Sequence, residues 1–184
     1  MSQIYDALKR LEAKRDAERR PAVASPAAPL DAIRVEQFLD LQRELLFAGR
    51  HEQDLPDRLV QGVAMFFRVA GAAVGVMEGG LYKVLGTYGL GPGDPERLRG
   101  QGSGDSELAH ALTARRPLVL RHRHAEGGTP VRDVVLPFHA HDFTGALHLV
   151  MPESETLTDE DLQLARAVAG LVGVALANAR LSPN

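Results

Sequence analysis

The chain has no cysteine and only a small excess of acidic over basic residues. Without cysteine it has no disulfide bonds, thiolate metal sites, cysteine nucleophiles or chromophores attached through a thioether. The formal net charge of −3 is too close to neutral to indicate a nucleic-acid partner. With 184 residues, 45% of them hydrophobic, the chain has enough apolar material for one domain with a buried core.

A membrane-spanning run and a secretory signal are also missing from the sequence. The longest apolar run, Ala167–Ala177, is too short to cross a bilayer and is flanked by Arg166 and Asn178. The N-terminus carries charged residues where a signal peptide would be apolar. We therefore expect a cytoplasmic protein that does not insert into a membrane.

Residues 1–20 form a distinct first segment, expected to be a short amphipathic helix. Ile4, Leu8 and Leu11 recur at helical spacing on a charged background, and residues 21–30 form a linker rich in Pro and Ala. The apolar stripe is too small to fold alone. We interpret residues 1–15 as a docking segment for a protein partner. Its expected contacts are Ile4, Tyr5, Leu8 and Leu11. The equal alternative is a helix that frays or packs on its own domain.

Residues 31–181 predict one folded domain. Helices are expected over Asp31–Gly49, Asp54–Gly71 and Ser106–Arg116, and from Thr158 to the end of the domain. Strands are expected over Ala72–Glu78, Leu81–Tyr88, Pro117–Arg121, Val131–His139 and Phe143–Met151. Gly79-Gly80 predicts a hairpin turn, and Gly89–Gly104 is expected to be a loop. Antiparallel hairpins with helices at both ends indicate an α+β fold.

Several local features occur in the order expected of one particular family. They are Gly89-Leu90 after the second strand, the segment Gly102–Pro117, the strand Leu136-Pro137-Phe138, the segment Gly145–Leu149 and the segment Leu157–Asp161 that opens the last helix. On these features residues 31–181 resemble a complete GAF domain. The resemblance implies an antiparallel sheet flanked by N- and C-terminal helices, and a role in sensing or dimerisation. Residues 1–15 loosely resemble the starts of bacterial tyrosine autokinases and secretion-linked proteins.

The last helix is apolar on two sides. One stripe is formed by Leu164, Val168, Leu171 and Ala175, and the other by Ala165, Val172, Leu176 and Ala179. A helix packed on one sheet buries only one face, so the second stripe requires a second partner. We therefore expect a homodimer built on the terminal helices. The dimerisation residues are expected to be Val168, Leu171, Val172 and Leu176.

The sequence contains no recognisable catalytic set and names no cofactor. His139 and His141 have the spacing of one strand face, and His148 lies on the next strand, so a metal site across the hairpin is geometrically possible. We expect these histidines to be solvated or to line a pocket instead. The Asn-Lys-x-x-x-Phe pattern of the family's cyclic-nucleotide binders is absent. Without cysteine, the thiol-dependent sulfoxide reductase activity of some members is excluded in that form.

These observations favour a non-enzymatic regulator that binds a small ligand or a partner protein. The resemblance implies a pocket between the sheet and residues 89–116, for which Tyr88, His110, Arg121 and His148 are the expected lining residues. One alternative is a structural dimeric adaptor whose pocket is filled by side chains. Another is a metal-dependent enzyme that uses the histidine cluster.

Overall fold

A five-stranded antiparallel sheet is the centre of the structure, a computed structural model that describes residues 32–47, 54–91, 94–100, 106–123 and 130–181. The strand order is β2-β1-β5-β4-β3. The strands are β1 (Gly71–Glu78), β2 (Leu81–Tyr88), β3 (Leu118–Arg123), β4 (Pro130–Ala140) and β5 (Phe143–Pro152). The helices are α2 (Ala32–Phe47), α3 (Leu55–Phe67), α4 (Asp94–Gly100), α5 (Glu107–Ala114) and α6 (Asp159–Leu181). The predicted α+β class is confirmed.

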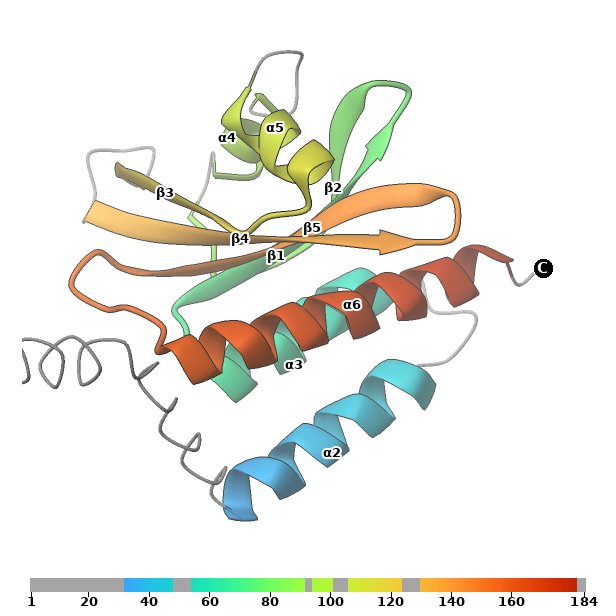
Figure 1. The fold of residues 1–184 in the computed structure, drawn as a ribbon, viewed down its shortest axis with the longest axis vertical. Helices are drawn as coiled ribbons and strands as arrows, with labels where there is room; N and C mark the ends of the chain where they lie inside the picture. The colour runs from blue at the N-terminus through green and yellow to red at the C-terminus, as the bar shows by residue number, and fades with distance from the viewer. Residues whose placement is uncertain (1–31, 48–53, 92–93, 101–105, 124–129, 182–184) are drawn as a thin grey trace, which may run out of the picture. The chain divides into compact units, whose positions relative to one another are not determined.

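Helices cover both faces of the sheet, but the two layers differ in kind (Figure 1). Helices α2, α3 and α6 lie on one face, where an extensive apolar core includes Val74, Leu136 and Leu149. The short helices α4 and α5 lie on the opposite face. There a smaller apolar cluster joins Tyr82 and Leu112. The second face is the one that also carries buried polar side chains.

Local sequence signals explain where several elements begin and turn. Ser106 accepts a hydrogen bond from the Ala109 N–H at 3.1 Å and so caps α5. Thr158 accepts one from the Asp161 N–H at 3.1 Å at the start of α6. The turn between β1 and β2 uses Gly79 and Gly80 with φ of 60° and 82°, as the hairpin prediction requires.

Two sequence expectations about boundaries are wrong. The segment expected to be a loop over Gly89–Gly104 contains helix α4, whose Leu98 is completely buried. Burial of this leucine stabilises a short helix, although the flanking Gly and Pro residues are typical of a loop. The second helix ends at Phe67 rather than at Gly71, because Arg68 adopts the left-handed C-cap conformation that glycine usually supplies.

Both apolar stripes of α6 find partners inside the domain. The helix packs against β4 and β5 on one side and against α2 and α3 on another. Val168, Val172 and Leu176 are buried in this way and Leu171 is partly buried. The reason for assigning these four residues to a dimer interface was therefore wrong, since the second stripe is already covered by helices of the same chain. A homodimer itself stays a prediction.

Helix α6 is also the one helix in the described ranges that is long and apolar enough to cross a membrane. Within Asp159–Arg180 a window of 18 residues has a mean hydropathy of 1.5, and 44% of that window is buried inside the domain. Its packing against the sheet and against α2 and α3 accounts for this composition. We describe it as a core helix.

Two glycines of α6 provide a test of this packing. A Cβ at Gly173 would lie 2.5 Å from a ring carbon of Phe138, whereas one at Gly170 would meet nothing within 4 Å. Gly173→Ala is therefore expected to lower the free energy of unfolding by about 1–3 kcal/mol through overpacking. Gly170→Ala is expected to raise it by up to about 1 kcal/mol through helix propensity. Urea unfolding measures both, and equal effects of the two variants would contradict the packing described.

Candidate functional site

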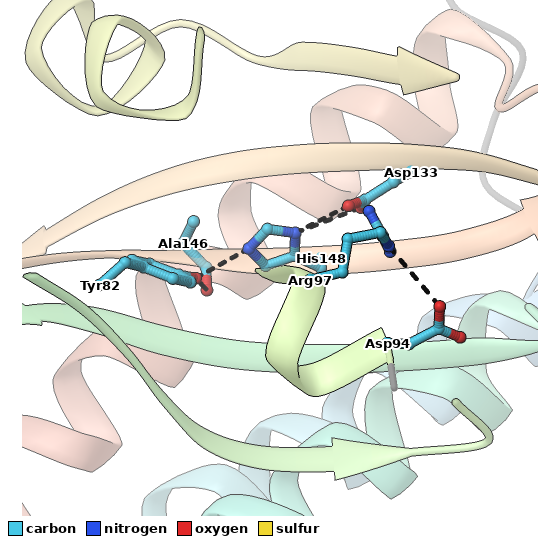
Figure 2. A network of polar contacts seen from close by, with 6 residues as sticks. All are labelled: Tyr82, Asp94, Arg97, Asp133, Ala146 and His148. Atoms are coloured by element: carbon cyan, nitrogen blue, oxygen red, sulfur yellow. Dashed lines mark hydrogen bonds and ion pairs between the residues drawn. The ribbon is translucent and has the colours of Figure 1, made fainter. Parts of the chain in front are cut away.

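A buried hydrogen-bonded network of three side chains lies on the face covered by α4 and α5 (Figure 2). His148 on β5 places its Nε2 2.7 Å from the Tyr82 hydroxyl and its Nδ1 3.0 Å from Oδ2 of Asp133. The Tyr82 hydroxyl also lies 3.3 Å from the Ala146 carbonyl oxygen. Asp133 and His148 are fully buried and Tyr82 is 3% exposed. The network therefore links β2, β5 and β4 beneath the two short helices.

Strand alternation explains why these polar groups face the same side. His148 lies two residues from Ala146 on β5 and is paired with Val135 of β4. Asp133 lies two residues before Val135, so its side chain points to the same face. An ionised carboxylate only accepts hydrogen bonds, so Nδ1 of His148 donates to Asp133. In the neutral ring Nε2 then accepts the hydrogen bond of the Tyr82 hydroxyl.

The environment of Tyr82 disfavours loss of its proton. Burial raises the pKa of the phenol well above its usual value, and the negative charge of Asp133 raises it further, while a backbone hydrogen bond from Gly75 partly offsets both effects. The hydroxyl therefore stays a hydrogen-bond donor over the physiological pH range.

A second polar pair on α4 lies close to the same sheet face. Nε of Arg97 is 3.6 Å from Oδ1 of Asp94, whose other oxygen accepts the Gly91 N–H at 3.0 Å. All three guanidinium nitrogens of Arg97 are buried and lack a hydrogen-bond partner among the described residues. Buried hydrogen-bond donors without a partner are uncommon in folded proteins. Arg97 therefore adds a buried guanidinium to the layer that contains His148 (Figure 2).

A pocket of about 220 Å³ opens between α5 and the sheet. Its lining residues are Met77, Ala109, Leu112, Thr113, His139 and Thr144. Leu112 belongs to the apolar cluster of Tyr82, and Met77 packs against that cluster and is paired with Tyr82 across β1 and β2. The pocket therefore adjoins the buried network. A second pocket of about 240 Å³ lies between α2 and α3, around Leu41, Leu45 and Met65.

The four predicted ligand residues are scattered over the domain. His148 lies on the expected face but is fully buried, while Tyr88, His110 and Arg121 are exposed. None of the four lines either of the two pockets. Their role in ligand binding stays a prediction. Tyr82 and Asp133 were not among the residues predicted from the sequence. The sequence does contain a signal for Asp133, because this carboxylate alternates with Val131 and Val135 and therefore lies on the same buried face of the strand.

The three histidines considered for a metal site do not come together. His139 is paired with Thr144 and His148 with Val135, so the two lie four residues apart along β4, roughly 13 Å at the usual strand rise. Nδ1 of His139 lies 2.8 Å from the Thr144 hydroxyl, and His141 occupies the exposed turn with φ of 49°. Within the described ranges no three His, Asp or Glu side chains are grouped to hold a metal ion.

Solved structures of several proteins share this architecture. The GAF domain of a phosphoenolpyruvate-protein phosphotransferase from Coxiella burnetii is 16% identical, with a TM-score of 0.66 over 80% of this chain and 94% of its own. This domain has the GAF fold. The phycoerythrobilin-bound GAF domain of a cyanobacterial phytochrome is 12% identical, with a TM-score of 0.54 over 80% of this chain and 96% of its own.

An enzyme shares the GAF fold as well. The free methionine-R-sulfoxide reductase from Neisseria meningitidis, solved with its substrate, is 11% identical, with a TM-score of 0.59 over 86% of this chain and 97% of its own. No family model and no curated protein matches the sequence. At these identities the likeness establishes the fold. The docking residues Ile4, Tyr5, Leu8 and Leu11 lie outside the described residues, and the comparisons do not support the resemblance of that segment to tyrosine autokinases.

The raised pKa of Tyr82 predicts a loss of stability at high pH. In the unfolded chain the phenol ionises near pH 10, whereas in the folded domain it keeps its proton to higher pH. The contribution of the buried phenol to the free energy of unfolding is therefore fully present below pH 10. Above pH 10 this contribution is lost at about 1.4 kcal/mol per pH unit. Between pH 10 and 11 the free energy of unfolding should fall more steeply in the unmodified protein than in Tyr82→Phe.

Urea unfolding at pH 9, 10 and 11 measures this difference. Tyr88→Phe, which removes an exposed phenol, is the matched control. If the free energy of unfolding falls equally with pH in the unmodified protein and in Tyr82→Phe, the Tyr82 hydroxyl is not in the buried environment described.

Proposed function

We propose that this protein is a non-enzymatic regulatory module that binds a small ligand in the pocket between α5 and the sheet. The observation that carries the proposal is the position of the pocket beside the buried network. Leu112 and Met77 both line the pocket and pack with Tyr82, whose hydroxyl is hydrogen-bonded to His148. Pockets that combine apolar walls with a few polar groups and perturbed titratable residues are the usual places where folds bind ligands.

The lining supports a small and largely uncharged ligand. Met77, Ala109 and Leu112 provide apolar contacts, while Thr113, His139 and Thr144 provide hydrogen-bonding groups at the rim. Among the described residues that line the pocket there is no Lys, Arg, Asp or Glu. A phosphorylated ligand would therefore lack a compensating charge. The volume of about 220 Å³ is also below the roughly 300–1,000 Å³ of pockets for drug-sized molecules.

The hairpin of β4 and β5 offers a route from the pocket to the opposite face. His139 and Thr144 form one cross-strand pair at the pocket, and Phe138 and Gly145 form the next pair. The Phe138 ring lies against Gly173 of α6, where there is no space for a Cβ. A ligand that shifts the first pair would therefore change the packing of α6. In this proposal the signal then passes to a partner by protein contact.

A structural adaptor is the second candidate, and one observation favours it. The side chains of Tyr82, Leu98, Leu108 and His148 are buried between the sheet and the short helices, so they occupy space in that layer. The remaining pocket is small. In this alternative the domain contributes only a scaffold and a surface, and no ligand is bound.

A matched pair of variants separates the two candidates. Ala109→Leu places a larger side chain in the pocket, whereas Ala114→Leu makes the same change at an exposed position of α5. Native mass spectrometry of the purified protein should detect a bound small molecule in the unmodified chain and in Ala114→Leu. It should detect none in Ala109→Leu. Absence of a bound molecule from all three proteins would contradict the ligand proposal and favour the adaptor.

We also propose that residues 1–15 dock on a partner protein. Deletion of residues 1–20 should leave the thermal midpoint of the domain nearly unchanged and abolish capture of the partner. Replacing Ile4 and Leu8 by Ala should reproduce the loss, because burial of each aliphatic side chain contributes roughly 1.5–3 kcal/mol. Lys14→Ala is the control with the apolar stripe intact. A midpoint lowered by many degrees on deletion would instead indicate that the segment stabilises its own domain.

A further inference from the structure

The two edges of the sheet differ in their contacts with the rest of the domain. At the β2 edge, the Thr87 N–H donates to Oδ1 of Asp57 at 2.8 Å, and Gly86 lies so close to Pro56 that a Cβ would come within 2.5 Å of its carbonyl carbon. The start of α3 therefore covers this edge around Gly86 and Thr87. At the other edge, all six residues of β3 pair with β4, and no other described strand pairs with them.

Two described side chains of β3 are exposed, and one of them is positively charged. Val119 is 51% exposed and Arg121 is exposed, while Leu118 and Leu120 are partly buried. Arg115 and Arg116 are exposed just before the strand begins. An edge strand presents unpaired N–H and C=O groups that can pair with another extended segment. The unpaired backbone of the edge and the exposed Arg121 therefore lie on the same strand, close to Arg115 and Arg116.

A like-charge pair across β3 and β4 adds an independent observation. Arg121 is directly opposite Arg132 in the register of the two strands. Like charges in that position repel one another, which costs stability. One Arg132 nitrogen donates to the Glu153 carbonyl oxygen at 3.1 Å, and its Nε is buried without a hydrogen-bond partner among the described residues. The nearby Asp133 side chain points to the opposite face and is engaged by His148.

We propose that β3 is a docking edge for an extended, acidic segment of a partner protein, which adds as a sixth strand. The backbone of that segment pairs with β3, its acidic side chains lie beside Arg121 on the face that also carries Arg132, and its apolar side chains lie beside Leu118 and Leu120. A second copy of this chain is disfavoured as the occupant, because edge-to-edge pairing would bring the arginines of the two copies together. The proposal is independent of ligand binding in the pocket near α5.

A synthetic peptide with the sequence Glu-Val-Glu-Val-Glu-Val-Glu tests the proposal on the full-length protein. Its alternation places all Glu side chains on one face in either strand direction. We expect saturable binding that weakens as salt is raised, with amide chemical-shift changes concentrated in residues 118–121. The peptide Lys-Val-Lys-Val-Lys-Val-Lys should not bind.

Charge reversal on β3 provides the matched variants. Arg121→Glu should weaken binding of the acidic peptide at least tenfold, whereas Arg166→Glu, at an exposed position of α6, should leave it unchanged. The circular dichroism spectrum and thermal midpoint establish that both variants fold. Absence of binding at millimolar peptide, equal binding to both variants, or shifts located away from β3 would each overturn the proposal. Concentration-dependent self-association without peptide would identify a second copy as the occupant and would also overturn it.

Discussion

The hydrogen bonds of His148 are the constraint on which the α4–α5 face depends. A histidine buried at the centre of a sheet must satisfy both ring nitrogens inside the protein, and here one faces Asp133 on β4 and the other Tyr82 on β2. Removing any one of the three leaves a buried polar partner unsatisfied, which costs more than the hydrogen bond contributes. The network therefore fixes β2, β5 and β4 relative to one another and sets the position of Tyr82 beside the pocket.

The two faces of the sheet have different properties because their covering helices differ. The face under α2, α3 and α6 is apolar, and its packing leaves no space for a Cβ between Phe138 and Gly173. The face under α4 and α5 combines apolar side chains with buried charges and a pocket at its rim. The hairpin of β4 and β5 contributes residues to both faces, since successive side chains of a strand point to opposite sides.

The sequence predicted most of the fold, since turns, caps and strand alternation are local signals. Gly79-Gly80, Ser106 and Thr158 each specify one boundary through the conformation or hydrogen bond they provide. It did not predict α4, where Leu98 is stabilised by contacts distant in sequence. The second stripe of α6 could not be assigned from the sequence either, because an apolar stripe does not specify whether another helix of the chain or another molecule covers it.

The candidate site was harder to predict than the fold. It depends on register: His148 was chosen because it is a histidine, but its partners Tyr82 and Asp133 are 66 and 15 residues away along the chain. The most direct test of the ligand proposal is an experimental structure of the protein isolated with its bound molecule. We predict that the molecule lies against Met77, Leu112 and His139, between α5 and the sheet. A molecule bound in the groove between α2 and α3, or an empty pocket closed by side chains, would contradict it.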